Sequence, residues 1–182
     1  MKFVYKPIKA AQAAAYLVRL SGGTMDVYAL IKILYLADRK CLVERGRSIT
    51  TDAMVSMPLG PVLSRIYDET KAPAEIQNRY WREYLTERED NLVSLRREDC
   101  PTDELSEYER RLLRSVYEEY RHLGFTDLKS LTHSLPEYTD PQGSSLPIDP
   151  ALILEQAGWS AEDIQDVRMS ANEEAFARAL CG

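Results

Sequence analysis

The chain is poor in histidine and cysteine, the residues that most often bind metals or act as nucleophiles. Its 182 residues include two histidines and three cysteines. Cys41, Cys100 and Cys181 lie far apart, and this spacing fits neither a disulfide framework nor a zinc knuckle. His122 and His133 are isolated from each other and from the cysteines, so we expect structural roles for both. The sequence therefore predicts no metal and no cofactor, and thiols of this kind are typical of a cytoplasmic protein.

Long apolar runs are also missing. No stretch of the sequence approaches the length needed to cross a bilayer. The first 23 residues come closest to a secretory leader, but Lys6, Lys9 and Gln12 interrupt their apolar part. We therefore expect no membrane partner, no signal peptide and a cytoplasmic location.

Motifs for catalysis and for nucleotide binding are absent. Ser21-Gly22-Gly23 follows no expected strand and is not followed by Gly-Lys-Ser/Thr, so it is not a phosphate loop. Pro61 in the Leu59-Gly60-Pro61 turn offers no N–H group to a phosphate. Adjacent carboxylates such as Glu118 and Glu119 diverge on a helix and cannot share a site. We expect that the protein is not an enzyme.

Positive charge is scarce in the second part of the chain. Residues 1–71 hold eleven Lys and Arg against six Asp and Glu, whereas residues 72–182 hold twelve against twenty-three. An acidic surface does not suit a phosphate backbone, so we expect no nucleic-acid partner. Arg39, Arg45 and Arg47 form a small basic cluster without a recognition helix. Such a cluster is either a solvated helix end or a docking patch for an acidic protein surface.

The apolar residues that are present recur at helical spacing. Hydrophobic residues make up 45% of the chain, enough for a core. We expect one domain over residues 1–182, mainly α, folded as a compact bundle of about seven helices. Residues 80–97 contain two partly alternating runs around a polar stretch, which predicts one small β-hairpin lying on the helices. The expected helices begin at Pro7, after a cap at Thr24, at Pro61, after caps at Ser106 and Thr126, at Pro150, and after a cap at Ser160.

The stretch from Ala29 to Glu69 resembles the signature of the SocA-like Panacea domain, an antitoxin family once labelled phage-associated protein. Members show a K-[LI]-LY-x-AD helix, a G-x-x-[IL]-T segment, and a GPV turn that enters a helix with an Ile-Tyr pair. Residues 131–138 look like a further L-[ST]-x-x-T-H…P-W segment, with Tyr138 in place of the tryptophan. The resemblance covers roughly residues 8–160. The matching residues of the first block are Lys32, Leu34, Tyr35, Ala37, Asp38, Gly46, Ile49, Thr50, Gly60, Pro61, Val62, Ile66 and Tyr67.

The resemblance implies an antitoxin that neutralises a toxin encoded beside it by binding that toxin directly. An alternative that it also implies is a proteolytic adapter that delivers the toxin to a ClpXP-type protease. The family pairs one domain with many unrelated toxins, so the resemblance does not identify the partner. An enzyme that reverses the toxin's modification would need a nucleophile or acid–base set that this sequence does not show.

The motif residues have a structural and a functional interpretation. Lys32 and Asp38 are separated by six positions, so they cannot pair along a helix. Each therefore belongs to a buried polar network or contacts the toxin. For direct toxin contact we expect Arg39, Arg45 and Arg47 to lead, because arginine is enriched at binding hot spots. We expect mainly structural roles for Lys32, Tyr35, Asp38, Gly60, Pro61, Val62, Tyr67 and His133.

Overall fold

The computed structural model of the protein describes residues 1 and 3–181, with the side chain of Cys181 outside the described part, so the expectation of a free thiol there is left aside. Within these residues the chain is mainly α, as predicted, with eight helices and five short strands. No helix in this part is long and apolar enough to cross a membrane. The helices are α1 (Pro7–Leu20), α2 (Val27–Arg45), α3 (Ser64–Glu69), α4 (Arg79–Tyr84), α5 (Glu107–Tyr120), α6 (Phe125–His133), α7 (Pro150–Gln156) and α8 (Ala161–Cys181). The strands are β1 (Thr24–Asp26), β2 (Met54–Ser56), β3 (Val62–Leu63), β4 (Leu92–Ser94) and β5 (Leu146–Pro147).

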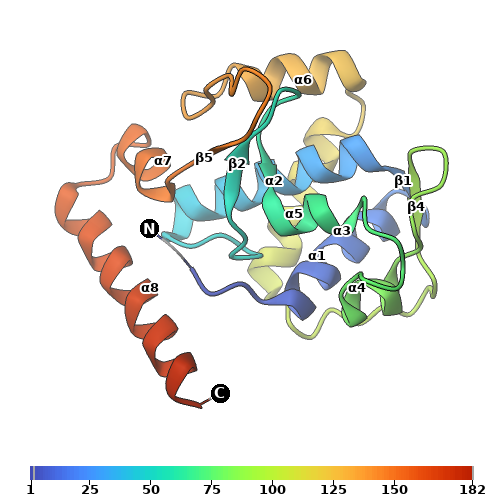
Figure 1. The fold of residues 1–182 in the computed structure, drawn as a ribbon, viewed down its shortest axis with the longest axis horizontal. Coiled ribbons are helices and arrows are strands. Elements are labelled where there is room, and N and C mark those ends of the chain that lie inside the picture. The colour runs from blue at the N-terminus through green and yellow to red at the C-terminus, as the bar shows by residue number, and fades with distance from the viewer. Residues whose placement is uncertain (2, 182) are drawn as a thin grey trace.

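The long helix α2 lies at the centre of the fold (Figure 1). The Asp26 side chain accepts a hydrogen bond from the Ala29 backbone N–H at 2.9 Å and caps its first turn. Gly46, with φ of 70°, ends the helix in the left-handed conformation. Residues 30–38 are buried without a break, which is typical of a helix surrounded on all sides. Helices α1, α5, α6 and α7 and strands β1 and β3 all contact α2.

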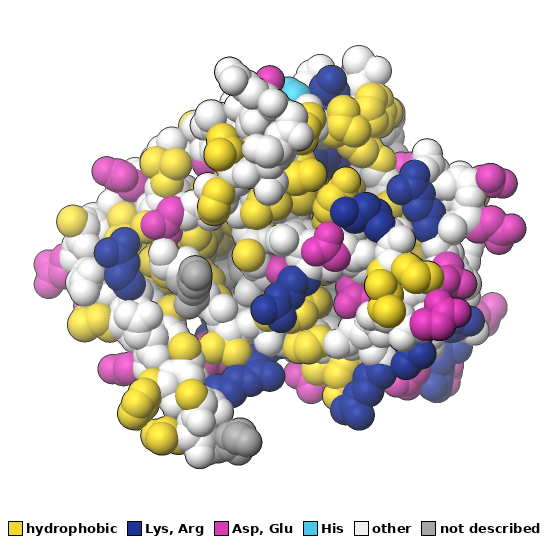
Figure 2. Space-filling view, viewed as in Figure 1, with side chains coloured by type: hydrophobic (Ala, Val, Ile, Leu, Met, Phe, Trp, Pro, Cys, Tyr) yellow, Lys and Arg dark blue, Asp and Glu magenta, His cyan; other side chains and the backbone are white. Residues whose placement is uncertain are grey.

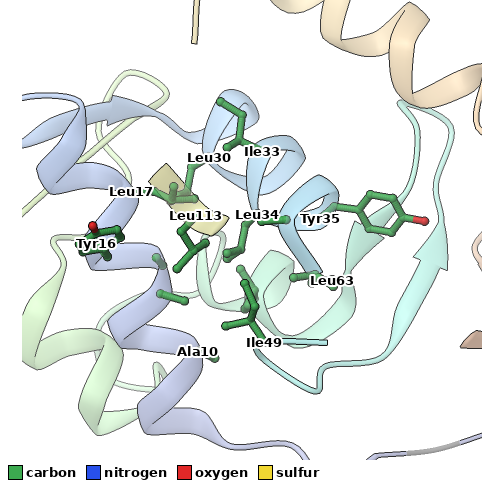
Figure 3. Packing of buried hydrophobic residues seen from close by; sticks show 14 of the residues in the cluster. Ala10, Tyr16, Leu17, Leu30, Ile33, Leu34, Tyr35, Ile49, Leu63 and Leu113 are labelled. Atoms are coloured by element: carbon green, nitrogen blue, oxygen red, sulfur yellow. The ribbon is translucent and has the colours of Figure 1, made fainter. Parts of the chain in front are cut away.

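The main hydrophobic core lies between α2, α1 and α5. Figure 3 shows Leu30 and Leu34 of α2 beside Leu17 of α1 and Leu113 of α5, all completely buried. Helix α1 brings small side chains to this contact, which lets neighbouring helix backbones approach closely. These side chains are the buried Ala10, Ala11, Ala13, Ala14 and Ala15.

Two small antiparallel sheets pack beside the helices. Strand β1 pairs with β4, with Met25 opposite Val93. Strand β2 lies between β3 and β5, with Met54 opposite Leu63 and Val55 opposite Pro147. The packing is thus a central helix surrounded by other helices and strands. The predicted mainly α class is confirmed, whereas the predicted bundle arrangement is not.

The predicted hairpin over residues 80–97 is wrong in its first arm. Residues 79–84 form α4, the helix that the prediction of about seven omitted. Trp81, Tyr84 and Leu85 are all buried, and their spacing of three and four residues is that of a helix face. In the second arm, β4 pairs chiefly with β1, almost seventy residues away, and meets the first arm only through single bridges such as Leu85 with Leu95.

Three predicted helix starts also move. Helix α3 begins at Ser64 and not at Pro61, because Val62 and Leu63 pair with β2. Helix α6 begins at Phe125, with Gly124 and not Thr126 in the cap position. Thr24 lies in β1, where its strand pairs with β4, so Asp26 takes over the capping role.

Gly46 lies at the point where the end of α2 packs against the last helix. A Cβ atom added there would lie 2.8 Å from Val167 Cγ2 and 3.2 Å from the Trp159 ring. Trp159 also donates its indole N–H to the Val43 carbonyl at 3.0 Å. The beginning of α8 therefore rests directly on the end of α2, and Figure 1 shows α8 running along the edge of the molecule toward the C-terminus.

We expect Gly46→Ala to destabilise the protein by more than the cost of a left-handed alanine, about 1–2 kcal/mol, because α8 must also shift. Chemical denaturation measures this loss, and limited proteolysis measures the release of α8. Gly22→Ala is the matched control, since Gly22 has φ of 90° and open space around it. Equal losses in the two variants would contradict the close contact with Val167 and Trp159.

Candidate protein-binding site

The buried Lys32 of α2 supports the turn at Gly60 and Pro61. Its side chain is fully buried, and its Nζ atom donates a hydrogen bond to the Pro61 carbonyl oxygen at 2.8 Å. Burial lowers the pKa of Lys32 to about 7. Gly60 has φ of 94°, and a Cβ atom there would lie 2.6 Å from Thr132 Oγ1 and 3.0 Å from Lys32 Nζ. Only glycine fits between α2 and α6 at this point.

His133 and Val62 complete this junction. The His133 Cδ2 atom would lie 3.1 Å from a Cβ atom at Gly60, and its ring stacks on Tyr138 with centroids 4.3 Å apart. Burial lowers the pKa of His133, so the ring is neutral at physiological pH. Val62 is buried in β3, directly after the turn. Residues from three separate motif blocks therefore meet here.

Asp38 ties the second half of α2 to the segment that follows it. Its fully buried carboxylate accepts a hydrogen bond from the Thr50 backbone N–H at 3.1 Å and another from the Thr50 hydroxyl. Burial raises the pKa of Asp38 to about 7, against these hydrogen bonds, which lower it. Lys32 and Asp38 thus take separate internal partners, and neither side chain reaches the surface.

A second buried network links α2 to the segment after α6. Tyr35 donates its hydroxyl proton to Glu137 Oε1 at 2.9 Å, and Arg39 binds both carboxylate oxygens at 2.7 and 3.2 Å. In Figure 3 the Tyr35 ring points away from the Leu17 and Leu113 side of α2. Burial and the Glu137 carboxylate together raise the pKa of Tyr35 well above its usual range. The sequence resemblance included Tyr35 but did not identify Glu137 as its partner. The sequence clue to Glu137 was its place directly after Pro136, inside the 131–138 motif segment.

The three arginines expected to contact a toxin do not form one patch. Arg39 is partly buried and bound to Glu137. Arg45 is exposed and lies over the Tyr108 ring of α5, 4.3 Å from its centroid. Arg47 Nη2 lies 2.7 Å from a carboxylate oxygen of Glu174 in α8. Each guanidinium therefore has an internal contact, and Arg45 offers the most surface to a partner.

A groove of about 710 Å³ lies at the other end of α2. It is bounded by β1, the first turn of α2, the turn before Gly60, α3, the 88–91 turn and the start of α6. Tyr67, named from the motif, lines it and is partly exposed. The lining residues are Ser21, Thr24, Met25, Asp26, Val27, Tyr28, Ala29, Ile31, Ile33, Leu59, Tyr67, Thr70, Arg88, Asn91, Tyr117, Arg121, Leu123, Gly124, Phe125 and Leu128.

Apolar side chains form the rim of this groove. Leu59 is 48% exposed and Phe125 is 51% exposed, and contiguous exposed apolar side chains often mark a site of interaction. The Tyr28 ring lies 4.4 Å from the Phe125 ring, centroid to centroid. Its hydroxyl, whose pKa burial raises to about 12, donates to the Leu59 carbonyl at 3.0 Å. Figure 2 shows hydrophobic side chains gathered over the start of α6, with basic side chains nearby.

The segment that carries these contacts matches a known protein family. A family model described as antitoxin SocA-like, Panacea domain, matches residues 30–138. The chain belongs to the SocA-like Panacea family. No significant match was found among curated proteins or among solved structures. The matched Panacea segment contains the Lys32 junction, the Glu137 network and the rim residues Leu59 and Phe125, whereas α7 and α8 lie outside it.

Among the described residues, no three His, Cys, Asp or Glu side chains are placed to hold a metal ion. Burial raises the pKa of Cys41 to about 12, and a thiol that stays protonated is a poor nucleophile. His122 is exposed just after α5. At the surface, the Panacea segment contributes most of the residues that line the groove.

Lys32 and Asp38 should give the protein a minimum of stability near pH 7. The folded-state pKa of Asp38 is raised from 3.8 to about 7, so the folded state binds more protons between these values and stability falls as the pH rises through them. The folded-state pKa of Lys32 is lowered from 10.5 to about 7, so the unfolded state binds more protons in that range and stability rises with pH.

Denaturation curves between pH 4 and 10 measure both slopes. We expect Asp38→Asn to flatten the falling part of the profile relative to wild type, and Lys32→Met to flatten the rising part. Each variant is the control for the other, because it should leave the opposite slope unchanged. Profiles that keep both slopes in both variants would exclude these two groups as their source.

Proposed function

We propose that this protein is an antitoxin that neutralises a cognate toxin by binding it directly, without catalysis, in the cytoplasm. Membership of the SocA-like Panacea family, shown by the match over residues 30–138, carries the proposal. The arrangement of polar groups supports it. Lys32, Tyr35 and Asp38 are fully buried and hydrogen-bonded within the protein, so they hold a scaffold and leave recognition to the surface.

We propose the groove beside Gly60 as the main docking site for the toxin. Exposed aromatic and leucine side chains around a pocket are typical of binding hot spots, especially where a rigid scaffold fixes their positions. Here α2 fixes the rim, because Tyr28 holds the Leu59 carbonyl and Lys32 holds the Pro61 carbonyl on either side of Gly60. An apolar side chain of the toxin would fill the space between Leu59 and Phe125.

The arginines at the far end of α2 remain proposed as additional contacts beside the groove. Arg45 leads among them because it is exposed, whereas Arg39 is committed to the buried Glu137 carboxylate. Replacing Arg39 would leave Glu137 buried without its cation, which destabilises the fold itself. Loss of binding in Arg39→Ala would therefore not identify a toxin contact, and Arg45→Ala is the informative variant.

The test is co-expression with the product of the neighbouring open reading frame, scored by growth rescue and by co-purification. We expect wild type to rescue growth and to form a stable complex. Leu59→Asp and Phe125→Asp should each weaken the complex about tenfold or more, because a charge replaces a rim side chain. Circular dichroism should show the native fold, since both side chains are exposed.

Leu152→Asp is the matched control. Leu152 is an exposed leucine of α7, 39% exposed, outside the groove, and its replacement should leave rescue and complex formation unchanged. If wild type rescues while the rim variants bind as tightly as Leu152→Asp, the toxin docks elsewhere. If wild type neither rescues nor binds, the antitoxin proposal is wrong.

Titrating toxin against antitoxin distinguishes direct neutralisation from the adapter alternative. Direct binding requires at least one antitoxin for each toxin at full rescue. Full rescue with toxin in molar excess, together with protease-dependent loss of the toxin, would identify a substoichiometric adapter.

A further inference from the structure

Helix α8 has two opposite faces, and only one of them lies on the protein. Ile164 and Val167 pack against the core, and Ala171 is buried. Glu174 then forms ion pairs with Lys6 at 3.3 Å and Arg47 at 2.7 Å, and Arg178 donates to the Tyr5 carbonyl at 3.1 Å. These contacts recur every three or four residues, so they occupy one stripe of the helix and fix its rotation.

The opposite stripe is exposed and changes from acidic to apolar along the helix. Its apolar members have unusually large exposed fractions, 47% for Met169, 67% for Phe176 and 71% for Leu180. Figure 2 shows hydrophobic side chains gathered over the free end of α8. The outer stripe, named so from here on, consists of Glu162, Asp166, Met169, Glu173, Phe176 and Leu180.

The chemistry of the outer stripe argues against a second copy of this chain that covers the whole stripe. A parallel in-register pair would place Glu173 against Glu173, and like charges that face each other repel. A fully overlapping antiparallel pair would place Leu180 against Glu162 and Phe176 against Asp166. That pairing would bury carboxylates on apolar side chains without cations, which is costly.

A groove with an apolar floor and a basic rim satisfies both parts of the outer stripe. Phe176 and Leu180 lie one helical turn apart, the spacing with which amphipathic helices anchor in grooves. Asp166 and Glu173 lie next to Met169 and Phe176 on the same stripe, where lysine or arginine of a partner would meet them. The inner stripe keeps its own ion pairs, so docking requires no unfolding of α8.

We propose that the outer stripe of α8 is a second docking surface, which inserts into a basic-rimmed apolar groove on the toxin. This inference rests on the proposed antitoxin function and extends it beyond the family-matched segment, because α8 begins after residue 138. It assigns Phe176 and Leu180 as anchors, with Asp166 and Glu173 as the charges that orient the helix.

The experiment measures the affinity of the full-length protein for the product of the neighbouring open reading frame. Phe176→Asp and Leu180→Asp should each weaken binding at least about tenfold, as expected for buried anchors. Glu173→Lys should weaken binding and reduce its dependence on salt, because it reverses a charge facing the basic rim. Leu152→Asp and Glu155→Lys, both at exposed positions of α7, are the matched controls and should bind as wild type does.

Three other outcomes would contradict the proposed docking role of α8, the antitoxin function, or both. Wild-type affinity in all three α8 variants, with a complex still sensitive to Leu59→Asp, would overturn the docking role of α8 and leave the antitoxin function intact. Absence of any wild-type complex would overturn the antitoxin function and this inference together. A wild-type homodimer in sedimentation that Phe176→Asp dissociates would show that a second copy, not the toxin, covers the outer stripe.

Discussion

The hydrogen bond from the buried Lys32 ammonium to the Pro61 carbonyl holds the molecule together where three distant segments meet. Burying an ammonium group is costly, and the pKa near 7 expresses that cost. This charged side chain lies at the centre of an apolar helix, and its hydrogen bond gives it a specific structural role there. It fixes the turn that places Leu59 at the surface. Tyr28, one helical turn earlier, holds the Leu59 carbonyl from the same face of α2.

The motif side chains of α2 lie inside the protein, whereas the proposed function is one of its surface. The motif residues of α2 bond to backbone or buried groups, and none of Lys32, Tyr35 and Asp38 reaches solvent. Their effect at the surface is indirect, through the position of the Gly60 turn and of the segment after α6. The side chains proposed for binding, Leu59 and Phe125, take no part in these internal hydrogen bonds.

Much of this scaffold could be predicted from sequence, where local signals agree with the packing. The capping box at Ser106, the cap at Asp149 and the glycine after α2 all reflect local hydrogen bonds or backbone angles, whereas the cap of α2 was expected at Thr24 and lies at Asp26. Predictions were wrong where contacts outside the segment itself decide its structure. The run at Trp81 looked alternating, but α1 covers its helical face, and Val62 leaves the helix because β2 offers it a partner.

The surface was less predictable than the core, for a related reason. Periodicity identifies a buried face, but it does not show which apolar side chains are left without a cover. Phe125 and Leu59 belong to different segments, and only the fold brings them to one groove. For the charged residues the sequence suggested free surface groups where the fold forms internal ion pairs. Arg39 and Arg47 bind carboxylates that lie 98 and 127 positions away in sequence.

The two proposed docking surfaces lie at opposite ends of α2, and this placement constrains any partner that uses both. The groove is built on the first turn of the helix, whereas α8 rests on Gly46 just beyond its last turn. The 19 residues of α2 span about 28 Å at the usual helical rise. A buried helix surrounded by packed elements does not change length, so α2 sets a fixed separation between the groove and the base of α8. A toxin contacting both surfaces would bind the second with little further loss of freedom, because the first contact already holds it in place. Discrimination between toxins would then depend on the distance between their two complementary sites as well as on the chemistry of each.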